Sequence, residues 1–304
     1  MIEEFTVKLI ANLPDNITNV KEPLVIDLVM DGGAFNGSYL LGALHFLKEM
    51  EKRKYIKIGR ISGCSVGSLA GFLYYIDGLH LMQKLYEILT DGFRERRNLE
   101  FIKDLKKHLG NHIPDDICQK INDKFFITYH NIKKGTKPVK CRYKNIDDVL
   151  NTIIKSSYIP FLIDGNLLYK NRYIDGIIPF IFKEKNRKIL YLDLFGYDKI
   201  AGIINVKNEK SNYHRVISGL LDIHTFYIKQ SSTQMCSYVN DWSIINRSTN
   251  YLKNIIEKLA VFLVYATILI NKIVPTEIKK GIIYKGGSKI LYEIFILIID
   301  NLCL

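Results

Sequence analysis

A serine between two glycines is the first feature of the sequence that could carry covalent chemistry. The stretch is Gly63-Cys64-Ser65-Val66-Gly67, with a strand-like segment before it and a helix-like segment after it. At such a turn the residues two positions before and after the serine must be small, because larger side chains would clash with the neighbouring strand and helix. The free N–H groups at the start of a helix also favour developing negative charge. The pattern therefore predicts that Ser65 is a nucleophile.

A glycine-rich loop with the sequence DGGAFNG occupies residues 31–37. Glycines directly after a buried strand let backbone N–H groups point into a site, either as a phosphate cradle for a nucleotide or as an oxyanion hole. A dinucleotide motif needs a glycine where Ala34 stands and an acidic residue after the next strand, and no GxxxxGK[ST] motif is present. The oxyanion hole explains the loop and Ser65 together. One such donor contributes about 3–4 kcal/mol to acyl transfer.

The serine needs a proton acceptor, and the sequence offers two kinds. His214 or His224 would complete a triad with an acid, although neither histidine has an informative setting. Asp175 follows a short strand-like segment and precedes Gly176, and strand ends are where α/β sheets place their chemistry. An Asp-Gly pair is also common in ordinary turns, so the residues alone leave these alternatives open.

The elements around these motifs alternate between strand and helix. Residues 24–30 form a near-continuous apolar run typical of a strand covered on both faces, and 38–50 have helical periodicity. A second strand is expected at 55–62, followed by a helix after Ser65. Further strands are expected at 125–129 and 189–195, a basic hairpin or loop at 130–144, and a helix at 146–157. The alternation predicts an α/β fold with a mostly parallel sheet.

The last third of the chain differs in composition. We expect a catalytic core over residues 20–205 and a helical, apolar extension over 206–304, packed on the core or lying at a membrane interface. Segments 254–274 and 290–304 are strongly apolar, yet neither reaches the ~18–20 apolar residues that a membrane-spanning helix needs. Buried core helices are the favoured interpretation and interfacial helices are the alternative.

The net charge is +12, from 43 Lys and Arg against 31 Asp and Glu. Basic clusters occur at Lys133, Lys134, Lys137, Lys140, Arg142 and Lys144 and at Lys183, Lys185, Arg187 and Lys188. They favour an anionic membrane surface as a peripheral partner, with a solvated basic face as the alternative. Nucleic acid is not expected, because no recognition motif accompanies the charge. Five irregularly spaced cysteines and an acidic N-terminus predict a reducing compartment and no signal peptide, hence a cytoplasmic protein.

Taken in order, the three motifs DGGAFNG (31–37), GCSVG (63–67) and DGI (175–177) resemble those of patatin-like phospholipases, the serine-aspartate lipid acyl hydrolases. The stretch IIKSSYIPFLIDGN, with YIDG after it, is similar to another block of that family. The resemblance covers roughly residues 24–200. It implies a three-layer α/β/α sandwich with a mostly parallel central sheet.

The resemblance also implies a mechanism. Ser65 would be the nucleophile and Asp175 would take its proton directly, as a dyad without histidine. Backbone N–H groups of Gly32, Gly33 and Ala34 would form the oxyanion hole, and no metal or cofactor would be needed. The expected substrate is a phospholipid or another acyl-ester lipid, cleaved through an acyl-serine intermediate. The alternative is a catalytically weak or inactive homologue that binds lipid or membrane.

Three residues depart from the family pattern. Ala34 replaces a glycine, which is tolerable if its φ is negative. Asn36 replaces the usual Arg or Lys and so removes a cation near the oxyanion loop. Ile177 replaces a small residue and is expected to narrow the site.

Overall fold

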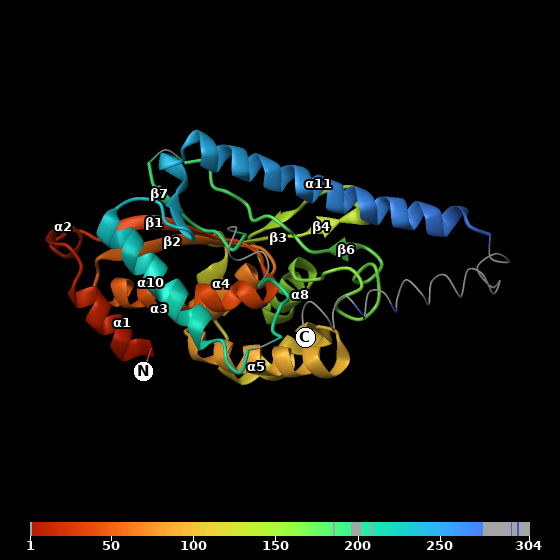
Figure 1. The fold of residues 1–304 in the computed structure, drawn as a ribbon, viewed down its shortest axis with the longest axis horizontal. Helices are drawn as coiled ribbons and strands as arrows, with labels where there is room; N and C mark the ends of the chain where they lie inside the picture. Colours follow the sequence, from red (N-terminus) through yellow and green to blue (C-terminus); the bar gives the residue numbers. More distant parts are fainter. Residues whose placement is uncertain are drawn as a thin grey trace.

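A six-stranded sheet lies at the centre of the molecule, in the order β5-β3-β2-β1-β7-β8 (Figure 1). The computed structural model describes residues 2–184, 186–195, 202–207 and 209–275, together with Glu293 and Leu297. The strands are β1 (Leu24–Met30), β2 (Ile56–Gly63), β3 (Phe125–Thr128), β5 (Val139–Lys140), β7 (Lys188–Leu192) and β8 (Cys236–Tyr238). The four inner strands are parallel, whereas β5 and β8 pair antiparallel at the edges. The prediction of an α/β fold with a mostly parallel sheet is confirmed.

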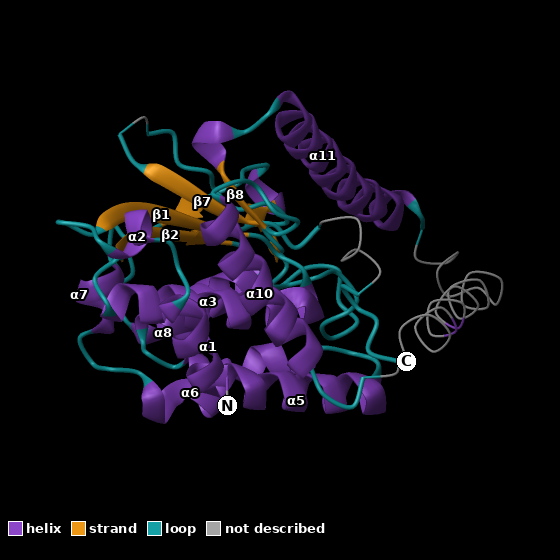
Figure 2. Ribbon diagram, turned by 60° about the vertical axis from the view of Figure 1, so that its left-hand side comes forward, coloured by secondary structure: helices purple, strands orange, loops and turns teal. Residues whose placement is uncertain are grey.

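Most helices cover one face of this sheet, and one long helix runs along the other side (Figure 2). The helices are α1 (Ile2–Ala11), α2 (Asp15–Thr18), α3 (Gly37–Lys52), α4 (Val66–Tyr75), α5 (Leu79–Arg96), α6 (Leu105–Leu109), α7 (Ile117–Ile121), α8 (Ile146–Ser156), α10 (Tyr213–Lys229) and α11 (Ile244–Ile273). Short 3-10 turns include η1 (Ala34–Asn36) and η4 (Ile132–Lys134). A separate two-stranded sheet pairs β4 (His130–Asn131) with β6 (Tyr173–Ile174).

From Ile26 onward both faces of β1 are buried, which explains its near-continuous apolar sequence. Leu28 and Met30 pack into the main core beneath the sheet, among the helices. Val29 points to the other face, where it packs with Phe182 and Tyr191. Because side chains alternate along a strand, buried apolar residues on both sides of β1 mean that both faces are covered.

The expected elements agree with the observed ones to within a few residues. The prediction of strands at 24–30, 55–62, 125–129 and 189–195 corresponds to β1, β2, β3 and β7, and the helices at 38–50 and 146–157 correspond to α3 and α8. The basic stretch 130–144 contains β4, η4 and β5. The region after residue 206 contributes α10 to the helical layer and β8 to the sheet. A boundary near residue 205 stays a prediction.

Helices α3 and α10 pack with their backbones in contact. A Cβ atom on Gly42 of α3 would overlap the carbonyl oxygen of Val216, and one on Gly219 of α10 would overlap that of Tyr39. Only glycine at both positions permits this close approach, which brings α10 against the helix that follows the glycine loop.

Gly42→Ala is therefore expected to lower the free energy of unfolding by about 3 kcal/mol, because the added methyl group must push two backbones apart. Urea denaturation followed by circular dichroism measures the effect. Gly110→Ala is the matched control, since a Cβ atom at Gly110 would meet no atom within 4 Å. Equal stability of the two variants would contradict the close helix contact.

The long helix α11 corrects the expectation for segment 254–274. It extends over 30 residues, begins where the Ser243 side chain accepts a hydrogen bond from the Asn246 N–H, and buries only Glu257 and Val264 fully. The favoured interpretation as a buried core helix is therefore wrong. By length and composition α11 could cross a membrane, and only 11% of its most apolar 18-residue stretch is buried. Segment 290–304 lies outside the described residues, apart from Glu293 and Leu297.

Candidate active site

Ser65 lies on the sharp turn between β2 and α4. Its backbone has φ 50° and ψ −130°, a conformation that L-residues rarely adopt and that marks strain held by the surrounding structure. The residue is buried, with 6% of its surface exposed, and stands directly before the first turn of α4. The chain thus holds this hydroxyl at the end of the sheet, above a helix N-terminus, where developing negative charge is favoured.

The two flanking glycines are required by the backbone of the turn. A Cβ atom on Gly63 would lie 2.5 Å from the carbonyl oxygen of Gly67, and one on Gly67 would lie 2.6 Å from those of Met30 and Asp31. The turn is therefore pressed against the end of β1. The expectation that larger residues would clash at both positions is confirmed.

The glycine loop lies directly against the serine. A Cβ atom on Gly32 would come within 3.0 Å of the Ser65 Cβ atom, so only a glycine lets the loop backbone approach this closely. Gly33 has φ 153°, in the region that favours glycine. Ala34 has φ 42°, so the condition of a negative φ is not met. The alanine is held at a positive φ, at a cost of about 1–3 kcal/mol. The N–H of its neighbour Phe35 donates to the Ile203 carbonyl at 3.0 Å.

Asp175 follows β6, the strand that pairs with β4. Its Oδ1 atom accepts a hydrogen bond of 2.6 Å from the Ile177 N–H, whereas its Oδ2 atom is buried without a hydrogen-bond partner among the described residues. Burial raises the pKa of Asp175 to about 6, opposed by the Ile177 N–H and the Ser65 hydroxyl. The carboxylate is thus desolvated beside the serine, with one oxygen unused. Catalytic hydrogen bonds are often loose before substrate binds.

Ser156, the last residue of α8, connects the two turns. The Ser65 N–H donates to both the carbonyl oxygen (3.1 Å) and the Oγ atom (3.0 Å) of Ser156, and the Gly176 N–H donates to the same carbonyl (3.2 Å). The Ser156 hydroxyl donates in turn to the Thr128 carbonyl at the end of β3. One helix terminus therefore fixes the spacing of two segments that are more than a hundred residues apart. Sequence reasoning missed this residue's function, although it lies in the SSYIP stretch.

An apolar pocket of about 300 Å³ contains all five predicted site residues. Ser65, Asp175, Gly32, Gly33 and Ala34 line it together. The remaining wall is apolar and comes from five segments: Ile159, Pro160, Ile174, Ile177, Phe195, Ile203, Ala260 and Val264. The last two belong to α11, whose contribution no sequence motif indicated. A small polar centre in an apolar cavity suits a substrate with a hydrocarbon chain next to a polar reacting group.

The two histidines considered as bases lie elsewhere. His214 is largely exposed and contacts Glu209, while His224 packs against Phe46, and neither lines the pocket. His130 is nearer, because it pairs across the small sheet with Ile174. Its Nε2 atom lies 3.0 Å from Glu257 of α11, so this ring is already engaged.

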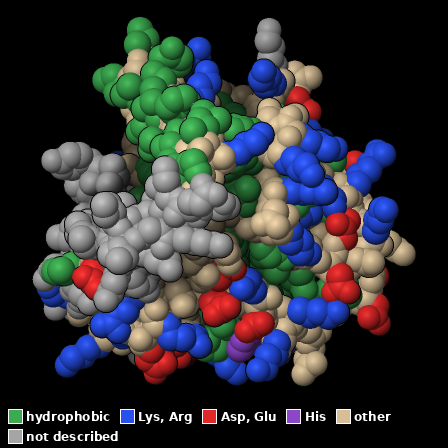
Figure 3. Space-filling model, turned by 90° about the vertical axis from the view of Figure 1, so that its right-hand side faces the viewer, with side chains coloured by type: hydrophobic (Ala, Val, Ile, Leu, Met, Phe, Trp, Pro, Cys, Tyr) green, Lys and Arg blue, Asp and Glu red, His purple; other side chains and the backbone are tan. Residues whose placement is uncertain are grey.

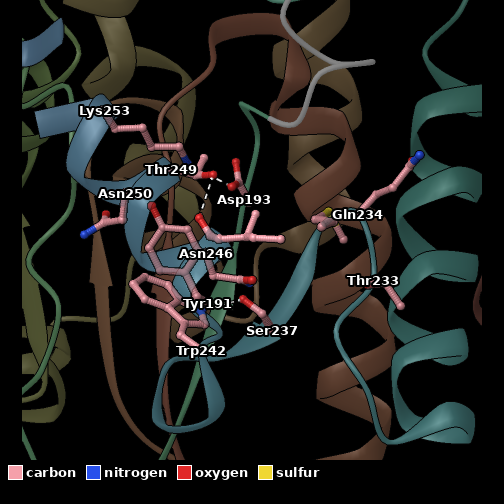
Figure 4. A pocket seen from close by; sticks show the side chains of 12 residues that line it. Tyr191, Asp193, Thr233, Gln234, Ser237, Trp242, Asn246, Thr249, Asn250 and Lys253 are labelled. Atoms are coloured by element: carbon pink, nitrogen blue, oxygen red, sulfur yellow. Dashed lines mark hydrogen bonds and ion pairs between the residues drawn. The ribbon is translucent and has the colours of Figure 1, made fainter. Parts of the chain in front are cut away.

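A buried charge cluster lies behind the glycine loop. Lys253 of α11 extends toward Asp193 (Figure 4), with its Nζ atom 2.9 Å from that carboxylate and 2.8 Å from Asp31. Asp31, the first residue of the loop, is completely buried. Burial raises its pKa to about 6, opposed by the charge of Lys253. The cluster therefore ties α11 to the start of the glycine loop.

A cation is present near the loop despite the substitution at Asn36. Arg215 of α10 is buried, and its Nη1 atom donates a 2.7 Å hydrogen bond to Asn36 Oδ1 and another to the Gly202 carbonyl. Its charge is compensated by Glu209, 2.6 Å away. The expectation that Asn36 removes a cation from this region is wrong, because a distant helix supplies one.

The comparisons with known proteins agree with the geometry. Residues 28–178 match a family model described as patatin-like phospholipase, and this span includes the glycine loop, the serine turn and Asp175. No match was found among curated proteins. Among the described residues, no group of three or more His, Cys, Asp or Glu side chains could hold a metal ion. Residues 28–178 therefore form a patatin-like phospholipase domain, a type of domain found in lipid acyl hydrolases.

Proposed function

We propose that the protein hydrolyses acyl-ester lipids, as a phospholipase A or lysophospholipase, with Ser65 and Asp175 as a catalytic dyad. One observation carries the proposal: a strained serine, a buried carboxylate with an unused oxygen and a glycine loop line the same apolar pocket. A structural serine would need neither the strain nor the shared pocket.

The proposed reaction has two steps. In the first, Ser65 Oγ attacks the ester carbonyl carbon, its proton passes to Asp175 Oδ2, and the carbonyl oxygen becomes an oxyanion facing the backbone N–H groups of Gly32, Gly33 and Ala34. The bond to the leaving alcohol then breaks, and Asp175 returns the proton to that alcohol. In the second step, Asp175 takes a proton from water as the water attacks the acyl-serine. The fatty acid leaves and Ser65 regains its proton.

The pocket supports a lipid substrate. Eight apolar residues surround the polar centre, and a hydrocarbon chain there gains about 25 cal/mol for each Å² removed from water. Such a chain also excludes water from Asp175, which strengthens its interaction with the serine proton. We propose peripheral attachment to an anionic membrane as the setting, because the net charge is +12 and α11 presents apolar side chains outward.

The test compares Ser65→Ala with Ser62→Ala on a phospholipid and on a soluble short-chain nitrophenyl ester. Ser62 lies three residues earlier in β2, and its hydroxyl is buried without a partner among the described residues, so its removal breaks no hydrogen bond seen there. We expect Ser65→Ala to lose hydrolysis of both substrates and Ser62→Ala to retain it. Full activity of Ser65→Ala would refute the proposal. Absence of hydrolysis by the wild-type protein, with lipid binding intact, would favour the non-catalytic alternative.

Hydrolysis is expected to depend on pH through Asp175. The base must be ionised, and burial raises its pKa to about 6. The kcat/KM for the soluble ester should therefore be constant above about pH 7 and fall about tenfold per pH unit well below pH 6. Initial rates between pH 4.5 and 8.5 measure this, with circular dichroism at each pH to confirm that the protein remains folded. A flat profile down to pH 4.5 would contradict a raised pKa at the base.

A further inference from the structure

The helix α11 exposes many large hydrophobic residues on the side that faces away from the core. Its side toward the core carries the charged residues Lys253 and Glu257, both largely buried in ion pairs. Its other side, which we call the outward face, carries large exposed hydrophobic residues. These are Ile244, Ile245, Tyr251, Leu252, Ile255, Ile256, Leu259, Phe262, Leu263, Leu269, Ile270 and Ile273. A helix facing water places its apolar stripe on the core, so this arrangement indicates an apolar environment outside.

Polar contacts along the length of α11 hold it against the core. Lys253 bonds Asp31 and Asp193, Glu257 bonds His130 and Lys137, and the Tyr265 hydroxyl donates to the Ile132 carbonyl at 2.7 Å. These contacts span about three turns and set which side points outward. A helix crossing a bilayer along its own axis would have to break them and carry two unpaired charges into hydrocarbon.

The outward face lies next to the apolar pocket of the candidate active site. Ala260 and Val264 line the pocket from the inner side of α11. Leu259, Phe262 and Leu263 are their sequence neighbours and are each more than half exposed. A lipid surface against these residues would therefore lie one helix diameter, ~10 Å, from the pocket wall.

Positive charge accompanies the apolar residues. Figure 3 shows hydrophobic side chains gathered at the top of the view, with Lys and Arg side chains beside and below them. Lys258 and Lys272 of α11 are exposed, and so are Lys133 and Lys134 of η4, next to Tyr265. The one acidic residue of α11 is Glu257, which is buried. This surface complements an anionic lipid headgroup layer and would repel a second positively charged copy of the chain.

We propose that the outward face of α11 docks flat on an anionic bilayer, with its hydrophobic residues at the boundary between headgroups and acyl chains. Such helices insert their apolar face about 5–10 Å. The pocket, bounded on that side by Ala260 and Val264, then lies at the membrane surface within reach of a lipid ester. The proposal rests on the proposed function for its substrate, while binding to vesicles tests it separately.

The first experiment places a single tryptophan on the outward face. Phe262→Trp is combined with Trp242→Phe, which removes the native tryptophan, and with Ser65→Ala, which leaves the vesicles intact. Phe5→Trp in the same background is the matched control, because Phe5 is an exposed phenylalanine on α1, far from α11 in Figure 1. With vesicles containing phosphatidylglycerol, we expect a blue shift and quenching by lipids brominated near the headgroup for F262W, and neither for F5W.

The second experiment removes the apolar character of the face. A triple variant with Leu259, Phe262 and Leu263 changed to Glu is compared with a triple variant carrying the same change at Ile217, Leu221 and Ile228, three exposed residues of α10. Vesicle flotation should show at least tenfold weaker binding for the α11 variant and unchanged binding for the α10 variant. Both should hydrolyse the soluble ester like the wild type, so a loss confined to vesicles separates docking from catalysis.

Several results would overturn the proposal. Tryptophan emission of F262W that is already blue-shifted without lipid, and that lipid does not change, would mean that protein covers the outward face. A dimer in solution that only the α11 variant disrupts would assign the face to a second copy. Quenching only by bromines near the acyl-chain ends would mean a spanning helix. Equal binding of both triple variants would place the docking surface elsewhere.

Discussion

Asp175→Asn is expected to lower kcat/KM for ester hydrolysis by about a thousandfold and, at the same time, to stabilise the protein at pH 7–8. Asparagine keeps the shape of the side chain and its bond from the Ile177 N–H, but it cannot accept the serine proton. Loss of a general base costs about 10²–10⁴ in rate. Rates with the soluble ester measure the first effect, and Asp115→Asn, an exposed carboxylate, is the control. A fall of less than tenfold would rule out Asp175 as the base.

The gain in stability follows from the raised pKa. In the folded chain the pKa of Asp175 is about 6, against an ordinary value of 3.8, so the folded state binds the proton more tightly than the unfolded state. The wild type therefore loses stability as the pH rises from about 4 to 6 and stays lower above that range. An asparagine side chain does not titrate, so the variant should gain about 1–3 kcal/mol at pH 7–8 and little at pH 4. Urea denaturation at the two pH values measures this, and a destabilised variant at pH 8 would contradict it.

Lys253→Met is expected to destabilise the protein by about 3–5 kcal/mol at pH 8. The substitution leaves Asp31 completely buried and without its counter-charge, and breaking a buried pair by removing one partner has a cost of this size. The deficit should shrink as the pH falls, because loss of Lys253 removes a contact that lowers the pKa of Asp31, and the buried carboxyl then takes up a proton more readily than in the wild type. Lys258→Met is the matched control, since Lys258 is exposed on the same helix.

The double variant Lys253→Met, Asp31→Asn separates charge from packing. If the cost comes from an uncompensated carboxylate, the second change should restore most of the lost stability at pH 8. Thermal and urea denaturation of the four proteins complete the cycle. A loss in Lys253→Met that is independent of pH, and that the second change does not restore, would mean that the lysine acts through its apolar stem alone.

Local sequence determined the segments of the candidate site because each depends on short-range backbone geometry. The apolar run 24–30 is buried on both faces and forms β1. The glycines around Ser65 are dictated by a turn in which any Cβ atom would meet neighbouring backbone. The prediction of Asp175 at a strand end is confirmed by its place after β6. Each of these signals needs only a few adjacent residues. The order of the three motifs along the chain then indicated the family resemblance.

Only the tertiary structure decided what surrounds these segments. Ser156 bridges the turns that carry Ser65 and Asp175. Arg215 supplies the cation that Asn36 lacks, and Lys253 reaches Asp31 from a helix more than two hundred residues later. Each contact depends on how distant elements pack, which no local pattern records. Segment 254–274 shows the same limit, because its apolar composition favoured a core helix although an interfacial helix has a similar composition. Whether such a helix is buried or exposed depends on the partners that the fold brings to each of its sides. In α11 those partners bind Lys253 and Glu257 and leave a row of large hydrophobic residues facing outward.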